Sequence, residues 1–338
     1  MNAGLLLHAS IALVPVLVFL AALVYFDSFK LLGFRTVFAA IAVGAVAAGA
    51  RYPINTLAFA SFPGEFESYS RYVSPWIEEF LKAVPVIFFI RTRRVGLQVD
   101  AAIVGFAVGT GFALVENLYY LASRPDAALA VQVIRGFGTA IMHGGATATL
   151  AMISVAIYEK RPSSGLHILV PGFLAAVALH SAFNHLLVRP VLATLVILLI
   201  LPFVIYCVFQ HSERVLRDWL DSDLDSKVQL LQLINTGSFL DSPSGRYLRS
   251  LRNRFRGEVL ADMLCYVRLH GELALRAKGV LLMRESGMEE PPIDTEMHER
   301  LAELAQLEHS IGKTGVLALR PLIMATGKDV WQLRLLGR

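Results

Sequence analysis

Long apolar segments recur through the first 210 residues, and each is close to the length that a helix needs to cross a bilayer. The chain is 55% hydrophobic and only 17% charged, whereas soluble domains carry about 25% charged residues. Apolar segments in lipid must satisfy their own backbone groups, which favours helices. The sequence therefore predicts an all-α, polytopic membrane helix bundle with seven candidate spans: 4–26, 34–51, 73–90, 100–122, 131–158, 167–188 and 190–210.

Residues 211–338 differ in composition from the apolar segments. Polar and apolar residues alternate there at helical period, and 18 Lys and Arg balance 18 Asp and Glu, so the net charge of +4 belongs to the apolar part. A neutral region does not favour nucleic-acid binding. The two cysteines, Cys207 and Cys265, lie far apart, and we expect no disulfide or thiolate metal site. We predict a transmembrane core at 1–210 and a cytoplasmic helical domain at 211–338.

Basic residues between the spans predict the orientation in the membrane. They are concentrated in the first, third and fifth loops and at the start of the polar region, while the alternate loops, in which Arg51 is counted, hold fewer. Loops rich in Lys and Arg stay in the cytoplasm. We therefore expect an integral protein of a bacterial-type plasma membrane with its N-terminus outside and its C-terminus inside.

The stretch WIEEFLK places Glu78, Glu79 and Lys82 at the head of an apolar helix. An ionisable side chain inside a bilayer costs roughly 3 kcal/mol or more on insertion scales, so each is a candidate functional group. Because Glu78 and Lys82 are four residues apart, we expect them to pair along the helix surface. Glu79 points about 100° away and would face a neighbouring helix. A purely structural ion pair at a helix end is the alternative.

The next span carries a carboxylate on a face of small residues. Gly105, Gly109, Phe112 and Glu116 share one side of the predicted helix. Small residues at this spacing let a second helix approach closely, which would bring Glu116 into a packed interface. The glycines alone could serve only packing, whereas a buried Glu beside an Asn favours a functional role.

Two later spans carry imidazoles. His143 lies in GFGTAIMHGGATATLAM, and His180 shares a helix face with Asn184. At 1.5 Å per residue, Glu79, Glu116, His143 and His180 lie ~18 to ~24 Å above the cytoplasmic ends of their helices. Four helices would thus deliver two carboxylates and two imidazoles to one layer in the outer half of the membrane, although a lone His is often a hydrogen-bonded core residue.

Carboxylates and imidazoles in a partly dry pocket support hydrolysis by two routes. A Glu and His pair can deprotonate a water molecule and protonate a leaving amine. Alternatively, Glu116, His143 and His180 could hold Zn²⁺ with an open position for water. The residue types leave both routes open.

Four ordered motifs within 70–190 resemble those of the PrsW family of intramembrane proteases. These are EEFLK at 78–82, GFALVEN at 111–117, His143, and HSAFN at 180–184. The chain is more distantly similar to the type II CAAX prenyl endopeptidases, although Lys82 and Glu116 stand where those carry other residues. The resemblance implies hydrolysis of a peptide bond in a membrane-protein substrate, possibly in site-1 cleavage of an anti-sigma factor. It places catalytic roles on Glu78, Glu79, Glu116, His143, His180 and Asn184, the last as an oxyanion or water-orienting donor.

Two other functions would also use buried ionisable groups in a membrane. A proton-coupled transporter could use the same residues as a relay, and a non-catalytic scaffold could retain them. Transporters commonly contain internal repeats with related broken helices, and the first three and last four spans show no such repeat. The sequence therefore favours an intramembrane protease whose partners are the lipid bilayer and a membrane-protein substrate.

Overall fold

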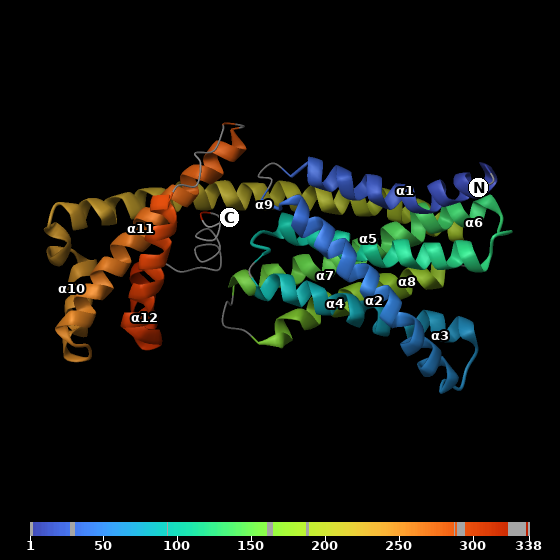
Figure 1. The fold of residues 1–338 in the computed structure, drawn as a ribbon, viewed down its shortest axis with the longest axis horizontal. Helices are drawn as coiled ribbons and strands as arrows, with labels where there is room; N and C mark the ends of the chain where they lie inside the picture. The colour runs from blue at the N-terminus through green and yellow to red at the C-terminus, as the bar shows by residue number, and fades with distance from the viewer. Residues whose placement is uncertain are drawn as a thin grey trace. The chain divides into compact units, whose positions relative to one another are not determined.

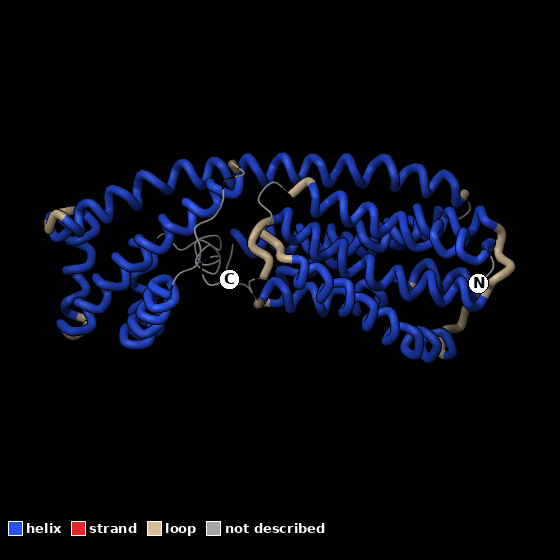
Figure 2. The backbone as a smooth tube through the Cα atoms, turned by 45° about the horizontal axis from the view of Figure 1, so that its top comes forward, coloured by secondary structure: helices blue, strands red, loops and turns tan. Residues whose placement is uncertain are grey.

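The computed structural model describes residues 3–27, 31–92, 94–160, 165–186, 189–286, 288, 295–323 and 336. Within these ranges the secondary structure is helical and contains no strand (Figures 1 and 2). Residues 1–212 and 213–338 form two compact units.

The first unit is a bundle of long helices joined by short elements. Six helices of the described chain are long and apolar enough to cross a membrane, which confirms the predicted all-α membrane bundle. The first unit contains α1 (Ala3–Tyr25), α2 (Phe34–Ala60), α3 (Phe66–Tyr72), α4 (Ser74–Arg91), α5 (Gln98–Ser123), α6 (Leu129–Val133), the π-helical turn η1 (Ile134–Thr139), α7 (Ala140–Lys160), the 3₁₀ turn η2 (Leu166–Leu169), α8 (Val170–Leu186) and the start of α9 (Pro190–Asn235).

The third predicted span, 73–90, corresponds to α4, which is not among these six helices. It is 18 residues long and carries four charged side chains, which lower its hydropathy. Three of them, Glu78, Glu79 and Lys82, are nevertheless buried against other helices. These three charges therefore face the interior of the bundle, while the fourth, Arg91, is exposed.

α5 is the central helix of the bundle, with every residue from Val99 to Ala113 buried. The glycines predicted to allow close packing do so against α7. A Cβ atom at Gly105 would lie 2.6 Å from the carbonyl oxygen of Thr147, and one at Gly109 would lie 2.4 Å from that of His143. Only glycine permits this separation, so α5 and α7 are in backbone contact beside the candidate site.

α2 extends beyond the predicted span of 34–51 and ends at Ala60. The prediction that Arg51 lies in a loop was therefore wrong. No helix-ending sequence occurs until Ser61, Phe62 and the Pro-Gly pair that follow, and Pro53 is tolerated inside the helix. Arg51 consequently projects from the helix into the bundle, and its side chain is 24% exposed.

α9 also differs from the predicted boundary, because the helix runs on past residue 210 without interruption. The chain has no Gly or Pro between Pro202 and Gly237, and Gly237 adopts a left-handed φ of 74° that stops the helix. The second unit also contains η3 (Ser238–Asp241), α10 (Pro243–Ser250), η4 (Leu251–Asn253), α11 (Gly257–Glu285) and α12 (Thr295–Ile323). Its core is built chiefly from α11 and α12, around side chains such as Met263, Leu273 and Leu319.

Candidate active site

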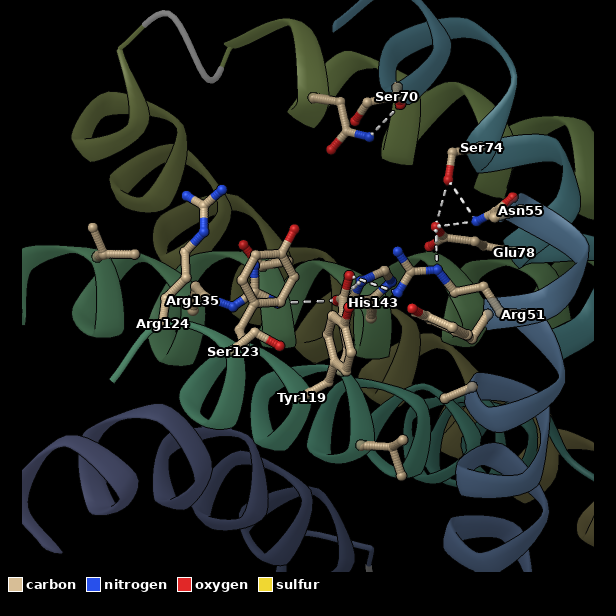
Figure 3. Close-up of a pocket in the computed structure, with 18 of the residues that line it drawn as sticks. Arg51, Asn55, Ser70, Ser74, Glu78, Tyr119, Ser123, Arg124, Arg135 and His143 are labelled. Carbon is tan, nitrogen blue, oxygen red and sulfur yellow. Dashed lines mark hydrogen bonds and ion pairs between the residues drawn. The ribbon is translucent and has the colours of Figure 1, made fainter. Parts of the chain in front are cut away.

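A cavity of about 1280 Å³ opens among the helices of the first unit. Its walls come from α2, α3, α4, α5, α7 and α8, together with α6 and the π-helical turn (Figure 3). Glu78, Glu116, His143, His180 and Asn184 all line it, while Glu79 does not. Five of the six residues predicted from sequence therefore share one cavity.

Glu78 is held on one oxygen and left accessible on the other. Its Oε1 accepts from Ser74 Oγ at 2.6 Å and lies 2.9 Å from Arg51 Nε, with Asn55 Nδ2 at 3.4 Å (Figure 3). Its Oε2 lies 3.8 Å from His180 Nε2. The donors on Oε1 fix the carboxylate, so Oε2 is the atom directed at the neighbouring imidazole.

Glu79 pairs with Lys82, and both side chains are fully buried. Lys82 Nζ donates to Glu79 Oε1 at 2.5 Å, and His180 Nδ1 lies 2.8 Å from the same oxygen. The expected pairing of Lys82 with Glu78 was therefore wrong. Arg51 from α2 neutralises Glu78 instead, and Lys82 Nζ also lies 3.2 Å from His143 Nδ1. The expectation that Glu79 faces a neighbouring helix holds, since it contacts α8.

Glu116 receives cations from two other elements. Arg51 Nη1 lies 2.9 Å from its Oε1, and Arg135 Nη2 of the π-helical turn lies 3.3 Å from its Oε2. His143 Nε2 is 3.0 Å from the same Oε2. Arg51 thus bridges Glu78 and Glu116, which would otherwise face each other as like charges.

His143 is hydrogen-bonded at both ring nitrogens. Its Nδ1 lies 3.2 Å from Lys82 Nζ, and a lysine ammonium can only donate. Nδ1 therefore accepts, which places the proton of the neutral ring on Nε2, where it donates to Glu116. The ring of His180 stands perpendicular to it, with 4.8 Å between centroids. Lys82 and Glu116 together fix the His143 tautomer.

Glu78, His143 and His180 could hold a metal ion. Each offers one donor atom, and the three donors lie within 4.8 Å of one another on three different helices. Two imidazoles and a carboxylate are a zinc donor set, and Glu79 behind His180 is the second carboxylate that commonly orients such a ligand. The residues fit a metal, with Glu78 in the place that the sequence analysis gave to Glu116. A metal would replace Lys82 or Glu116 at one nitrogen of His143.

Asn184 lies at the cavity wall but is bound elsewhere. Its Nδ2 donates to the carbonyl oxygen of Ser70 at 2.9 Å, and Ser181 on the same helix donates to the carbonyl oxygen of Arg71 at 2.7 Å. These contacts join α8 to α3. The amide nitrogen of Asn184 therefore holds α8 against α3.

Two cationic members of the site, Arg51 and Arg135, were not predicted from the sequence. Arg135 lies inside the predicted span 131–158, and the rule applied to Glu and His within spans would have identified it. Arg51 follows a run of small apolar residues, and no residue near it interrupts the helical pattern. That continuity was the available sign that Arg51 belongs to the helix and not to a loop. Both arginines neutralise carboxylates that come from other helices.

The chain matches the model of a known protein family. The model for the PrsW family of intramembrane metalloproteases matches residues 33–209, just over half of the chain. These residues include every helix that lines the cavity. No curated protein and no solved structure gives a significant match.

Proposed function

This chain belongs to the PrsW family of intramembrane metalloproteases, and from that premise we propose that it hydrolyses a peptide bond of a membrane-anchored regulatory protein of the anti-sigma-factor class. The chain is a peptidase and an integral multi-pass membrane protein. The observation that carries the proposal is the convergence of Glu78, His143 and His180, buried and with donor atoms within 4.8 Å, at a cavity large enough for a peptide.

We assign the metal to the zinc class and to Glu78, His143 and His180. A bound Zn²⁺ lowers the pKa of a water molecule and polarises a carbonyl group. Glu79 orients His180 through Nδ1, and Ser74 and Arg51 hold Glu78. These contacts restrict two of the three donors, Glu78 and His180, before any ligand arrives.

Of the carboxylates that line the cavity outside this donor set, Glu116 is buried and Asp126 is exposed. We propose that Glu116 Oε2 accepts the proton of the attacking water and that the same group then protonates the leaving amine. Arg51 and Arg135 fix its position and Asn184 contributes an amide once substrate enters.

We propose that the N-terminus lies outside and the C-terminus in the cytoplasm of a bacterial plasma membrane. Arg51 lies in α2 and not in the predicted loop, so the loops assigned to the outside contain one basic residue fewer. The excess of basic residues in the loops assigned to the cytoplasm is therefore larger than the sequence alone indicated. The cavity is lined by residues 124–127 of the α5–α6 connection, which this orientation places outside. Cleavage would then occur in the outer half of the membrane.

The test uses the purified chain in liposomes with a Glu78→Gln trapping variant. Proteins captured by the variant, but not by wild type, are identified by mass spectrometry and then tested as substrates. We expect wild type to cleave them and to hold about one zinc per chain, and we expect Glu78→Gln and His180→Ala to lose both properties. Glu65→Gln is the matched control, because Glu65 is exposed and does not line the cavity. Full activity of both site variants would end the protease assignment to these residues.

A further inference from the structure

The π-helical turn between α6 and α7 is a packed part of the cavity wall. A Cβ atom at Gly136 would lie 2.0 Å from the carbonyl oxygen of Ile11, and one at Gly138 would lie 2.4 Å from Thr194 Oγ1. Asn117 Nδ2 donates to the carbonyl oxygens of Ala12, at 2.7 Å, and Arg135, at 3.5 Å. π-Helical turns are rare and are frequent at functional sites. The turn is therefore held in place from α1, α5 and α9.

Two polar side chains of this wall lack hydrogen bonds that burial would normally require. Gln132 is 2% exposed, its Oε1 has no partner, and its amide bonds no residue in the described part of the chain. Arg135 lies over the ring of Tyr120 at 3.6 Å, yet its Nε and Nη2 are also buried without a hydrogen bond, despite the ion pair to Glu116. Both residues line the cavity. Because a buried unpaired polar group destabilises a fold, its retention needs a reason.

We propose that Gln132 and Arg135 bind the main chain of the substrate segment beside the scissile bond, an inference that rests on the proposed function. A substrate helix must unwind to expose a peptide bond, and its freed N–H and C=O groups then need partners in a site with little water. Arg135 supplies donors for a carbonyl oxygen, and the amide of Gln132 supplies an acceptor for an N–H. The two residues are three apart and so adjacent on the helix surface.

Binding of a peptide main chain explains the unsatisfied polar atoms of Gln132 and Arg135 better than a purely structural role does. Neutralising Glu116 requires one charged nitrogen of Arg135, and that contact leaves its Nε unused. Neutralisation of Glu116 also does not explain why Gln132 is buried without a hydrogen-bond partner among the described residues. A main-chain ligand satisfies both groups and imposes little sequence preference. The scissile segment would thus be selected by its ability to unwind.

The experiment measures peptide binding and thermal stability in the Glu78→Gln background, so that cleavage does not interfere. The probe is a fluorescent transmembrane peptide of about 25 residues, rich in Leu and Ala, with a Gly-Gly break in its outer half. Gln132→Met removes the amide at nearly constant volume. Thr110→Val is the matched control, because Thr110 Oγ1 is also buried without a partner but does not line the cavity.

The two variants separate a binding role from a structural one. We expect Gln132→Met to raise the Kd of the probe about 3- to 10-fold and the melting temperature by about 2–4 °C. Thr110→Val should raise the melting temperature and leave the Kd unchanged. An unchanged Kd in Gln132→Met, or a lower melting temperature, would overturn the proposal. A wild-type chain that cleaves no peptide would instead refute the proposed function, and the binding result would still be interpretable.

Discussion

Replacing Gly109 with alanine tests whether the contact between α5 and α7 sets the geometry of the site. The added Cβ would lie 2.4 Å from the carbonyl oxygen of His143 and 2.6 Å from the Cα of Gly144, both backbone atoms. Ordinary contact begins at 3.4 Å, so the helices must separate by about 1 Å. His143 is the residue on α7 that donates to Glu116 on α5, at 3.0 Å.

The expected losses follow from that displacement. Overpacking a core costs about 1–3 kcal/mol, partly offset by the ~1 kcal/mol by which alanine is favoured over glycine in a helix. A 1 Å misplacement of reacting groups costs about 100-fold in rate. We therefore expect Gly109→Ala to lose about 100-fold in cleavage in liposomes while its unfolding free energy falls by at most about 2 kcal/mol.

Gly279→Ala is the control for this substitution. Gly279 lies in α11, where an added Cβ meets nothing within 4 Å, so alanine should stabilise the helix and leave cleavage unchanged. Cleavage by Gly109→Ala within threefold of wild type would show that the two helices do not require this separation. The explanation of the Glu116 and His143 geometry would then fail.

Three further predictions concern charge, topology and pH. Lys82→Met leaves Glu79 buried without its cation, which should cost about 3–5 kcal/mol of unfolding free energy, measured by thermal unfolding in detergent; an unchanged melting temperature would contradict the pairing. Reporters fused at residue 63 and at the C-terminus should report the outside and the cytoplasm, and a reversed pair would overturn the orientation. Burial raises the pKa of Tyr266 from 10.0 to about 12, so the unfolded chain ionises first and the stability of the fold should fall as pH rises from 10 to 12. The Tyr266→Phe variant should lose this pH dependence of stability. An equal fall in the stability of the wild-type and variant proteins would refute the prediction.

The sequence identified carboxylates and imidazoles that the structure brings together, but not all of their partners. Hydropathy and helical period placed Glu79, Glu116, His143 and His180 at similar depths, since depth follows from position along a helix. A depth carries no information about rotation around the helix axis relative to neighbours. Lys82 could reach either carboxylate by spacing alone, and the choice depended on Arg51 from a helix whose end had been placed too early.

Charge balance explains why these helices must assemble together. Glu78, Glu79 and Glu116 come from α4 and α5, while their cations come from α2, α4 and η1. Removing one partner of a buried ion pair leaves an uncompensated charge, which is more costly than losing the pair as a whole. Arg51 of α2 pairs with both Glu78 and Glu116, so one side chain compensates carboxylates from two other helices. The side chains proposed for catalysis therefore also stabilise the fold. A variant that removes only one charge of this cluster should change both the stability and the activity of the protein.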